Sequence, residues 1–167
     1  MDRAASVLAR AEALCRERGV RLTPQRRRVL EILVASDRPL GAYEILAALS
    51  GPQGKAAPPT VYRALEFLLE QGLVHRLETL HAFVGCNHPD HPHSSQFLIC
   101  AECGEVQELE DAAVAQTLGS AAAETGFQAR RPVVEVIGTC AGCLHGGSQG
   151  APGTLAEGHP PAATEPE

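Results

Sequence analysis

Two Cys-x-x-Cys pairs stand out among the residues of this chain that could bind a metal ion. Cys100 and Cys103 form the first pair, and Cys140 and Cys143 form the second. Two such pairs, separated by a folding unit of about forty residues, are a strong signal for a tetrahedral zinc-thiolate site. Four thiolates leave no open position, so we expect this zinc to be structural. Two redox-active dithiols are the alternative, but no thioredoxin-like context surrounds them.

A second set of metal-ligating residues is concentrated between His75 and Glu108. These 34 positions contain five of the seven histidines and also Cys86. With the paired cysteines assigned, a second tetrahedral site could be formed by His75, Cys86, His93 and Glu108. A mixture of thiolate and imidazole favours Zn²⁺ over Fe²⁺ or Mn²⁺. In the same loop, His91 or His88 is the alternative to His93.

The composition limits the classes to which the chain can belong. Only six of its 167 residues are aromatic, which favours two small cores over one large core. It shows neither a transmembrane run nor a signal peptide, so we expect a cytoplasmic protein that is not bound to membranes, whose thiols stay reduced. Residues 1–78 carry 12 basic and 9 acidic side chains, net +3, whereas residues 79–167 carry 2 and 11, net −9. This asymmetry is typical of a basic, partner-binding module joined to an acidic remainder.

The first half has the pattern of a winged helix, a variant of the helix-turn-helix. Apolar spacing predicts four helices followed by two short strands. The helices cover residues 4–18, a segment that begins at Thr23-Pro24, residues 40–49 and residues 61–71, and the strands cover 73–77 and 82–84. Thr23 and Thr60 are expected to cap the second and fourth helices.

In a winged helix, the fourth of these helices would enter the major groove of double-stranded DNA. Arg63 near its start could bind a guanine through two hydrogen bonds, and Tyr43 and Tyr62 could reach the backbone or thymine methyl groups. We therefore expect the DNA-contacting residues to be Tyr43, Thr60, Tyr62 and Arg63. Core packing of Tyr62 and a surface ion pair of Arg63 are the alternatives.

The second half is predicted to be an α/β unit with a small sheet. Strands are expected over 96–99, 106–109 and 133–137, and an alanine-rich helix over 112–124. The chain as a whole is therefore predicted to be α+β. We expect a winged-helix domain over 1–84, a metal-binding dimerisation domain over 85–144, and a disordered tail over 145–167.

Four motifs of this chain resemble those of a known family. They are Leu22-Thr23-Pro24-Gln25-Arg26, Pro59-Thr60-Val61-Tyr62-Arg63-Ala64-Leu65, Phe97-Leu98-Ile99-Cys100-Ala101-Glu102-Cys103-Gly104 and Cys140-Ala141-Gly142-Cys143. Together they resemble the ferric-uptake-regulator family of metal-dependent bacterial transcription factors, and within it the zinc-uptake regulator branch. The resemblance extends over residues 5 to 144.

This resemblance implies a homodimer that represses zinc uptake and homeostasis genes and is not an enzyme. It implies two zinc ions per protomer, in the structural and the regulatory site named above, and a near-palindromic DNA operator. Iron-sensing members have a His-His-Asp-His run at positions where this chain reads Ser94-Ser95-Gln96-Phe97. This departure argues against a sensor of iron or peroxide.

Three other functions remain as alternatives. A family member could sense iron, manganese or peroxide instead of zinc. A zinc hydrolase would need an open metal position and a general acid or base such as Glu102 or Glu105. A zinc buffer without DNA function would not need the Thr60–Leu65 motif.

Overall fold

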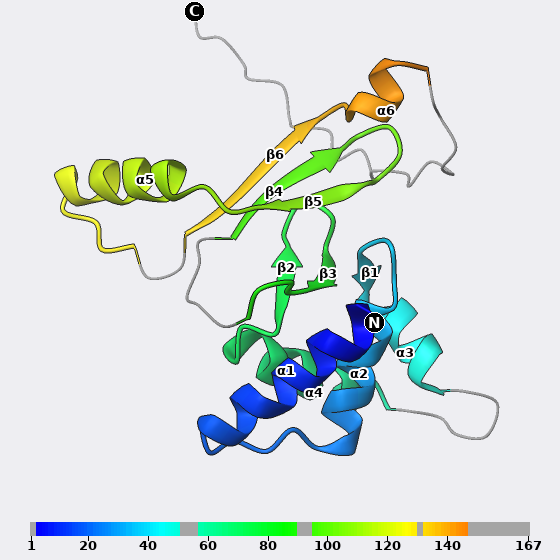
Figure 1. Ribbon diagram of the computed structural model, residues 1–167. Coiled ribbons are helices and arrows are strands. Elements are labelled where there is room, and N and C mark those ends of the chain that lie inside the picture. The colour runs from blue at the N-terminus through cyan, green and yellow to red at the C-terminus, as the bar shows by residue number, and fades with distance from the viewer. Residues whose placement is uncertain (1–2, 51–56, 90–94, 130–131, 147–167) are drawn as a thin grey trace, which may run out of the picture.

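The computed structural model describes residues 3–50, 57–89, 95–129 and 132–146. Its elements follow the predicted order of helices, hairpin and α/β half, so the predicted α+β fold class is confirmed. The helices of the first half lie at one end of the molecule and the second sheet at the other (Figure 1). No helix in these ranges is long and apolar enough to cross a membrane. Most of the tail that we predicted to be disordered lies outside the described residues.

Four helices form most of the first half. They are α1 (Arg3–Glu17), α2 (Pro24–Val34), α3 (Ala42–Ser50) and α4 (Pro58–Glu70). Gly19 follows α1 with a φ of +66°, a conformation that glycine adopts without steric cost. Thr23 caps α2 as predicted, because its hydroxyl accepts a hydrogen bond from the Arg26 N–H at 3.4 Å. Cys15 is buried within the first core, as expected for a small apolar side chain.

The predicted starts of two helices are wrong. Leu40–Gly41, predicted to begin the third helix, form the short strand β1. α4 begins earlier than predicted, at Pro58, and its N-cap is Ala57, so Thr60 lies inside the first turn and caps nothing. Pro58 and Pro59 have no N–H group for a capping side chain to satisfy, which explains why the threonine is not needed there.

The wing is the hairpin of β2 (Val74–Leu77) and β3 (Ala82–Gly85), and both strands match the prediction closely. β1 pairs with the outer edge of β3, so the sheet has three strands in the order β1-β3-β2. The apolar sides of the helices and of the wing meet in one core. Its fully buried members include Val29, Leu30, Ile45, Val61, Leu65, Leu68, Leu73 and Val74.

The second half contains the three predicted strands and the predicted helix. Its elements are β4 (Ser95–Cys100), β5 (Val106–Leu109), α5 (Ala112–Glu124), β6 (Val133–Gly138) and a short helix α6 (Ala141–Leu144) that we did not predict. The strand order is β5-β4-β6, with β4 antiparallel to β5 and parallel to β6. Asp111 caps α5 by accepting hydrogen bonds from the backbone of Ala113 and Val114.

A second apolar core joins the two halves, and we call it the wing–sheet cluster. It consists of Leu77, Leu80 and Val84 from the wing and Phe97, Ile99 and Val106 from the second sheet. Leu77, Phe97 and Ile99 are almost completely buried. Figure 1 shows the turn of the wing meeting this sheet. The wing therefore has two roles in packing, because its sides belong to different cores.

Candidate metal centres and nucleic-acid interface

The four paired cysteines meet at one end of the second sheet. Cys100 ends β4, Cys103 lies in the following turn, and Cys140 and Cys143 lie at the start of α6 and within it. The parallel pairing of β4 with β6 ends at Cys100, which lies opposite Gly138. Both Cys-x-x-Cys turns therefore lie at the same end of the sheet, beyond the C-terminal ends of these two strands. All four sulfur atoms lie within 4.8 Å of one another.

The distances between these sulfur atoms fit a metal site rather than disulfides. Cys100 and Cys143 Sγ are 3.9 Å apart, and Cys103 and Cys140 Sγ are 3.7 Å apart. A tetrahedron with Zn–S bonds of ~2.3 Å has edges of ~3.8 Å, whereas a disulfide bond measures ~2.05 Å. The four residues therefore have the spacing of a closed zinc-thiolate site.

Hydrogen bonds make the four thiols unequal. The backbone N–H groups of Cys103 and Cys140 donate to Cys100 Sγ and, against the effect of burial, lower the pKa of that thiol to about 6. The pKa of Cys143 is raised, first by its hydrogen bonds to Cys140 and Cys103 and then by burial. An ionised Cys100 would offer Zn²⁺ a first thiolate ligand, and binding of the ion would release the protons that the site still holds.

A second ligand cluster lies where the wing meets the second sheet. His75 lies on β2, Cys86 directly follows β3, and Glu108 lies on β5. Their candidate ligand atoms all lie within 4.8 Å of one another, and His75 Nε2 is 3.0 Å from Glu108 Oε1. Cys86 is 1% exposed. The structure thus brings together three of the four residues predicted for this site, from two different sheets.

The fourth ligand predicted for this cluster, His93, lies outside the described residues, as does its alternative His91. His88 is described and is exposed. Among the described residues, no other His, Cys, Asp or Glu joins the group. Three protein ligands leave one position of a tetrahedral zinc site to be filled.

Two further residues that we did not predict surround this cluster. The Asn87 N–H donates to Glu108 Oε2 at 3.4 Å, and the rings of His75 and Phe97 contact each other in a T-shaped arrangement with centroids 5.3 Å apart. Phe97 and Ile99 are buried whereas Leu98 is partly exposed, so the alternation along β4 could have predicted the inward position of Phe97. Nothing local in the sequence indicates the role of Asn87.

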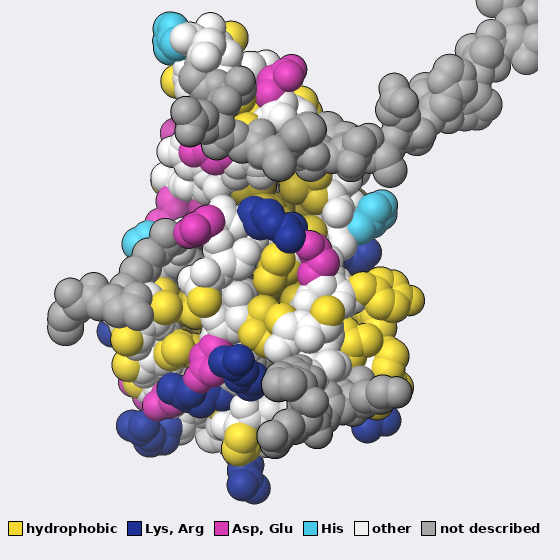
Figure 2. Space-filling view, turned by 90° about the vertical axis from the view of Figure 1, so that its right-hand side faces the viewer, with side chains coloured by type: hydrophobic (Ala, Val, Ile, Leu, Met, Phe, Trp, Pro, Cys, Tyr) yellow, Lys and Arg dark blue, Asp and Glu magenta, His cyan; other side chains and the backbone are white. Residues whose placement is uncertain are grey.

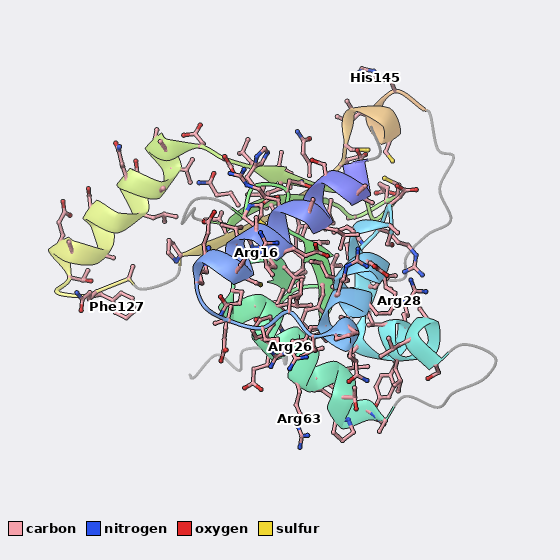
Figure 3. The ribbon with its side chains drawn as sticks, turned by 60° about the horizontal axis from the view of Figure 1, so that its bottom comes forward. Arg16, Arg26, Arg28, Arg63, Phe127 and His145 are labelled. Carbon is pink, nitrogen blue, oxygen red and sulfur yellow. The ribbon has the colours of Figure 1, made fainter. Side chains whose placement is uncertain are left out.

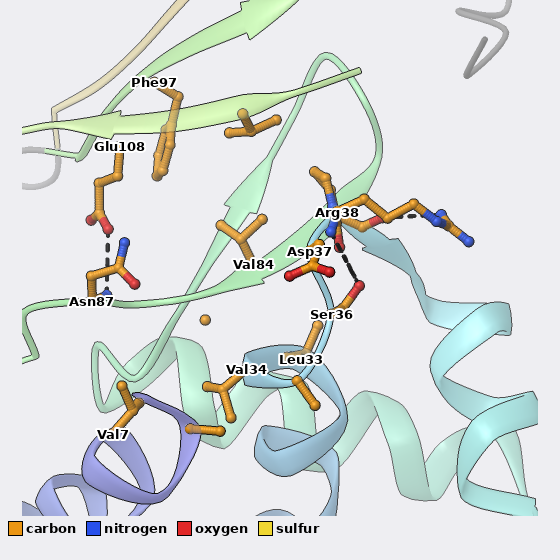
Figure 4. Close-up of a pocket in the computed structure, with 15 residues that line it drawn as sticks. Val7, Leu33, Val34, Ser36, Asp37, Arg38, Val84, Asn87, Phe97 and Glu108 are labelled. Atoms are coloured by element: carbon orange, nitrogen blue, oxygen red, sulfur yellow. Dashed lines mark hydrogen bonds between the residues drawn. The ribbon is translucent and has the colours of Figure 1, made fainter. Parts of the chain in front are cut away.

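A cavity of about 460 Å³ opens beside Glu108, between the two halves. Val7 and Val34 line it from the helices, and Val84, Asn87 and Glu108 line it from the wing and the second sheet (Figure 4). Ions and water could therefore reach the ligand cluster from this side.

The predicted DNA-contacting residues are mostly on the surface of the first half. Tyr43 and Tyr62 are 77% and 52% exposed, so Tyr62 is not a core residue. Arg63 extends from α4 clear of the rest of the molecule (Figure 3), and among the described residues it forms no ion pair. Thr60 is half-buried in the first turn of α4. On the face in Figure 2, most of the visible arginine side chains gather in the lower part, which the first half forms.

The arginines at the start of α2 are largely occupied within the first half. Arg27 pairs with Glu12 at 2.6 Å and also with Glu31. Arg26 stacks on the Phe67 ring at 3.7 Å from its centroid. These side chains stabilise contacts between helices, which leaves Arg63 as the unpaired cation on the exposed side of α4.

A winged helix whose wing shares candidate metal ligands with a second sheet is the arrangement expected of a metal-dependent DNA-binding protein. The chain belongs to the ferric uptake regulator family, whose family model matches residues 17–137. This is a family of regulators, which confirms that the chain is not an enzyme and rules out the zinc-hydrolase alternative.

Individual relatives agree with this assignment. The chain is 45% identical over 139 residues to the zinc uptake regulation protein of Escherichia coli (strain K12), covering 83% of this chain and 81% of that protein. It is 34% identical over 145 residues to the peroxide operon regulator of Bacillus subtilis (strain 168), covering 84% and 95%. The curated relatives thus include regulators named for zinc and for peroxide.

Three solved structures are also similar to this chain. A zinc uptake regulator complexed with zinc and DNA has a TM-score of 0.82 and 42% identity, covering 87% of this chain and 97% of that one. The holo form of XcZur has a TM-score of 0.78 and 45% identity, covering 84% and 98%. The apo form of XcZur, at 44% identity and coverage of 86% and 99%, has a TM-score of only 0.52.

Proposed function

We propose that this chain is a zinc-responsive, DNA-binding repressor of zinc uptake and homeostasis genes. The observation that carries the proposal is the cluster of His75, Cys86 and Glu108, which joins the DNA-binding half to the second sheet. The relatives named for zinc uptake support the same function. A protein of this kind works in the cytoplasm, beside the DNA and where thiols stay reduced.

Each protomer would hold two zinc ions with different roles. Cys100, Cys103, Cys140 and Cys143 would bind the structural ion, because four thiolates close the site. His75, Cys86 and Glu108, with His93 as the fourth ligand, would bind the regulatory ion. Thiolate and imidazole together favour Zn²⁺ over Fe²⁺ and Mn²⁺.

The regulatory ion would act by selecting one arrangement of the two halves. Shifting an equilibrium from 1:99 to 99:1 requires about 5.5 kcal/mol of differential binding, which a four-ligand zinc site can supply. The arrangement described above resembles the zinc-and-DNA complex and holo XcZur far more than apo XcZur, although both XcZur forms are similarly identical in sequence. This contrast supports a metal-dependent change in domain arrangement.

The second half, residues 85–144, would form the dimer interface. None of the residues of α5 is buried, and Figure 1 shows this helix projecting from the sheet. A helix gains most of its stability from packing an apolar side, so α5 needs a partner surface. Among the described residues of this half, the large apolar side chains that are exposed are Leu98, Leu109, Leu118, Phe127, Val133, Val136, Ile137 and Leu144. A second copy of the chain would cover them, and such a two-fold dimer would read a near-palindromic operator.

DNA contacts would come from residues 1–84, through Tyr43, Thr60, Tyr62 and Arg63. The exposure of both tyrosines and of Arg63 supports this assignment. The position of Thr60 near the N-terminus of α4 suits a contact with a phosphate.

Gel-shift assays with zinc titration and a chelator test the function, on duplexes selected from a random library by the zinc-loaded protein. We expect binding with zinc, loss of binding with the chelator, and weaker responses to iron and manganese.

Cys86→Ser should leave a folded dimer that no longer binds DNA in zinc, whereas Cys103→Ser should lose the dimer. Full zinc-responsive binding by Cys86→Ser would contradict the regulatory site.

A further inference from the structure

Glu135 attaches the second sheet to the wing at a point separate from the metal ligands. Its carboxylate accepts hydrogen bonds from two consecutive backbone N–H groups, that of Glu78 at 2.6 Å and that of Thr79 at 2.9 Å. Glu135 lies on β6, whereas Glu78 and Thr79 begin the turn between β2 and β3. We call this pair of hydrogen bonds the Glu135 contact.

The strand register explains why Glu135 and Glu108 both face the wing. Phe97 on β4 is paired with Glu108 on β5 and with Glu135 on β6. Directly paired residues of neighbouring strands project on the same face of a sheet. The three side chains therefore form a row across one face, with the buried Phe97 between the two carboxylates. Leu98 and Val136, one position along, are exposed on the opposite face.

The environment of Glu135 favours the charged carboxylate. Burial raises its pKa, but hydrogen bonds from the Thr79 side chain and from the backbone of Thr79 and Glu78 outweigh burial and lower the pKa. Hydrogen bonds to an ionised group are shorter and stronger than those between neutral groups. The Glu135 contact therefore requires no metal ion at neutral pH.

We propose that Glu135 is a positioning residue that holds the wing against the second sheet without metal and so sets the zinc concentration at which the regulatory site fills. The inference rests on the proposed function. His75 and Cys86 come from the wing side, and Glu108 comes from the sheet, so the site is complete only when the two are together. Only the arrangement in which the wing contacts the sheet can bind zinc at this site. The apparent dissociation constant for zinc is inversely proportional to the fraction of molecules in that arrangement. Removing the Glu135 contact makes that arrangement rarer.

The test is the zinc affinity of the second site in the full-length dimer, measured by competition with a chelating dye. Glu135→Gln should raise the free zinc needed for half-filling about tenfold, within the range typical of coupling between sites. Two quantities should not change: the affinity for DNA at saturating zinc, and the amount of zinc bound at the four-cysteine site. Glu110→Gln removes the same charge from an exposed position of the same half and should match the wild type. Equal zinc affinities for Glu135→Gln and Glu110→Gln would overturn the proposal.

Two further measurements keep the inference separate from the proposed function. Glu135→Asp keeps the charge but is too short to reach both N–H groups, so it should also weaken zinc binding, and wild-type affinity would overturn the proposal. Hydrogen exchange of the peptide covering residues 77–81 should be faster in both variants, with or without zinc. If the wild type binds only one zinc ion per protomer, the proposed function fails. The hydrogen exchange then tests the Glu135 contact by itself, and unchanged exchange in both variants would contradict it.

Discussion

Tyr43, Tyr62 and Arg63 show how single residues of this chain depart from the usual pattern of burial. The two tyrosines are the most exposed large apolar side chains of the first half. Large aromatic side chains are normally buried or placed at interfaces, because exposure forfeits the free energy of removing their surface from water. The proposed contact with DNA would account for the exposure of both tyrosines and of Arg63, which follows Tyr62 on α4.

Arg63→Ala should weaken DNA binding by about 1–3 kcal/mol and relax the preference at one base pair, since it removes one bidentate contact. Zinc binding should not change. The measurement is fluorescence anisotropy on operator variants at two salt concentrations. Arg16→Ala, which removes an exposed charge from α1, serves as the control. An equal loss for both variants would mean that Arg63 contributes charge alone.

Glu44 supplies a prediction about pH. The Arg38 guanidinium donates to its carboxylate at 2.5 Å and, with the Gly41 N–H, holds the pKa of Glu44 below its usual value of 4.5. Because the folded pKa is depressed, the stabilisation is complete above pH 4.5 and is lost as the pH falls through the folded pKa. An NMR titration should place the Glu44 midpoint below 4.5. Glu44→Gln should lower the free energy of unfolding by only ~0.5 kcal/mol at neutral pH, because the Glu44 side chain is nearly half exposed and solvent weakens its ion pair. A midpoint at or above 4.5 would contradict the prediction.

At the scale of secondary structure elements, the direction of the strands decides where the metal ligands meet. β4 and β6 run parallel, so both Cys-x-x-Cys turns emerge at the same end of the sheet. A parallel pair needs a long crossover connection, and α5 lies in the segment that makes it. In the first half, the close approach of β3 to α2 places Cys86 next to the second sheet.

Gly85 marks this close approach. A Cβ atom at this position would lie 2.7 Å from Val34 Cγ1, so either the Val34 side chain or β3 must shift to admit a larger residue. Gly85→Ala should lower the free energy of unfolding by about 1–3 kcal/mol and weaken the regulatory site, because Cys86 follows directly. Thermal unfolding and zinc titration are the measurements. The same change at Gly119, which lies within α5 and would contact nothing within one protomer, should leave the stability of the protomer unchanged or raise it. Equal effects at both glycines would contradict this explanation.

At the scale of the whole molecule, three kinds of contact between described residues hold the wing to the second sheet. They are the His75, Cys86 and Glu108 cluster, the apolar wing–sheet cluster, and the Glu135 contact. In the proposed function, metal binding would therefore add only part of the free energy that holds the halves together. A sensor needs this balance, because an interface that is stable without zinc would not respond to it.

Phe97→Ala should test the apolar part of this balance. Phe97 is 1% exposed and lies between the two halves, so its truncation should cost about 3–5 kcal/mol and weaken regulatory zinc binding as well. Leu98→Ala, on the opposite face of β4, should instead weaken the dimer and leave zinc affinity nearly unchanged. Calorimetry, zinc titration and sedimentation separate these effects. Identical profiles for the two variants would mean that the two faces of the sheet do not have separate roles.

Much of the fold and of the candidate site could be predicted because the signals are local. Apolar spacing, caps and turn residues act within a few positions, and they located most helices and all three strands of the second sheet. Each Cys-x-x-Cys pair is also a local motif. The starts of the third and fourth helices were predicted wrongly for different reasons. Leu40 and Gly41 form a strand because they pair with β3, about forty residues further along the chain. The fourth helix begins at two prolines, which have no N–H group for a capping side chain, so it begins before Thr60 and does not use it as a cap.

The sequence by itself determined most of the helices and strands, although not β1 or α6, and it determined which side chains are able to bind zinc. Only the tertiary structure decided which of them meet: that His75 and Cys86 reach Glu108 across two sheets, and that Glu135 reaches the turn at Glu78 and Thr79. The physical reason is that strand register and the packing of one sheet on another depend on contacts between residues far apart in the chain. Periodicity along a single segment indicates which side of a strand is buried, but not which residue of a distant segment lies opposite it.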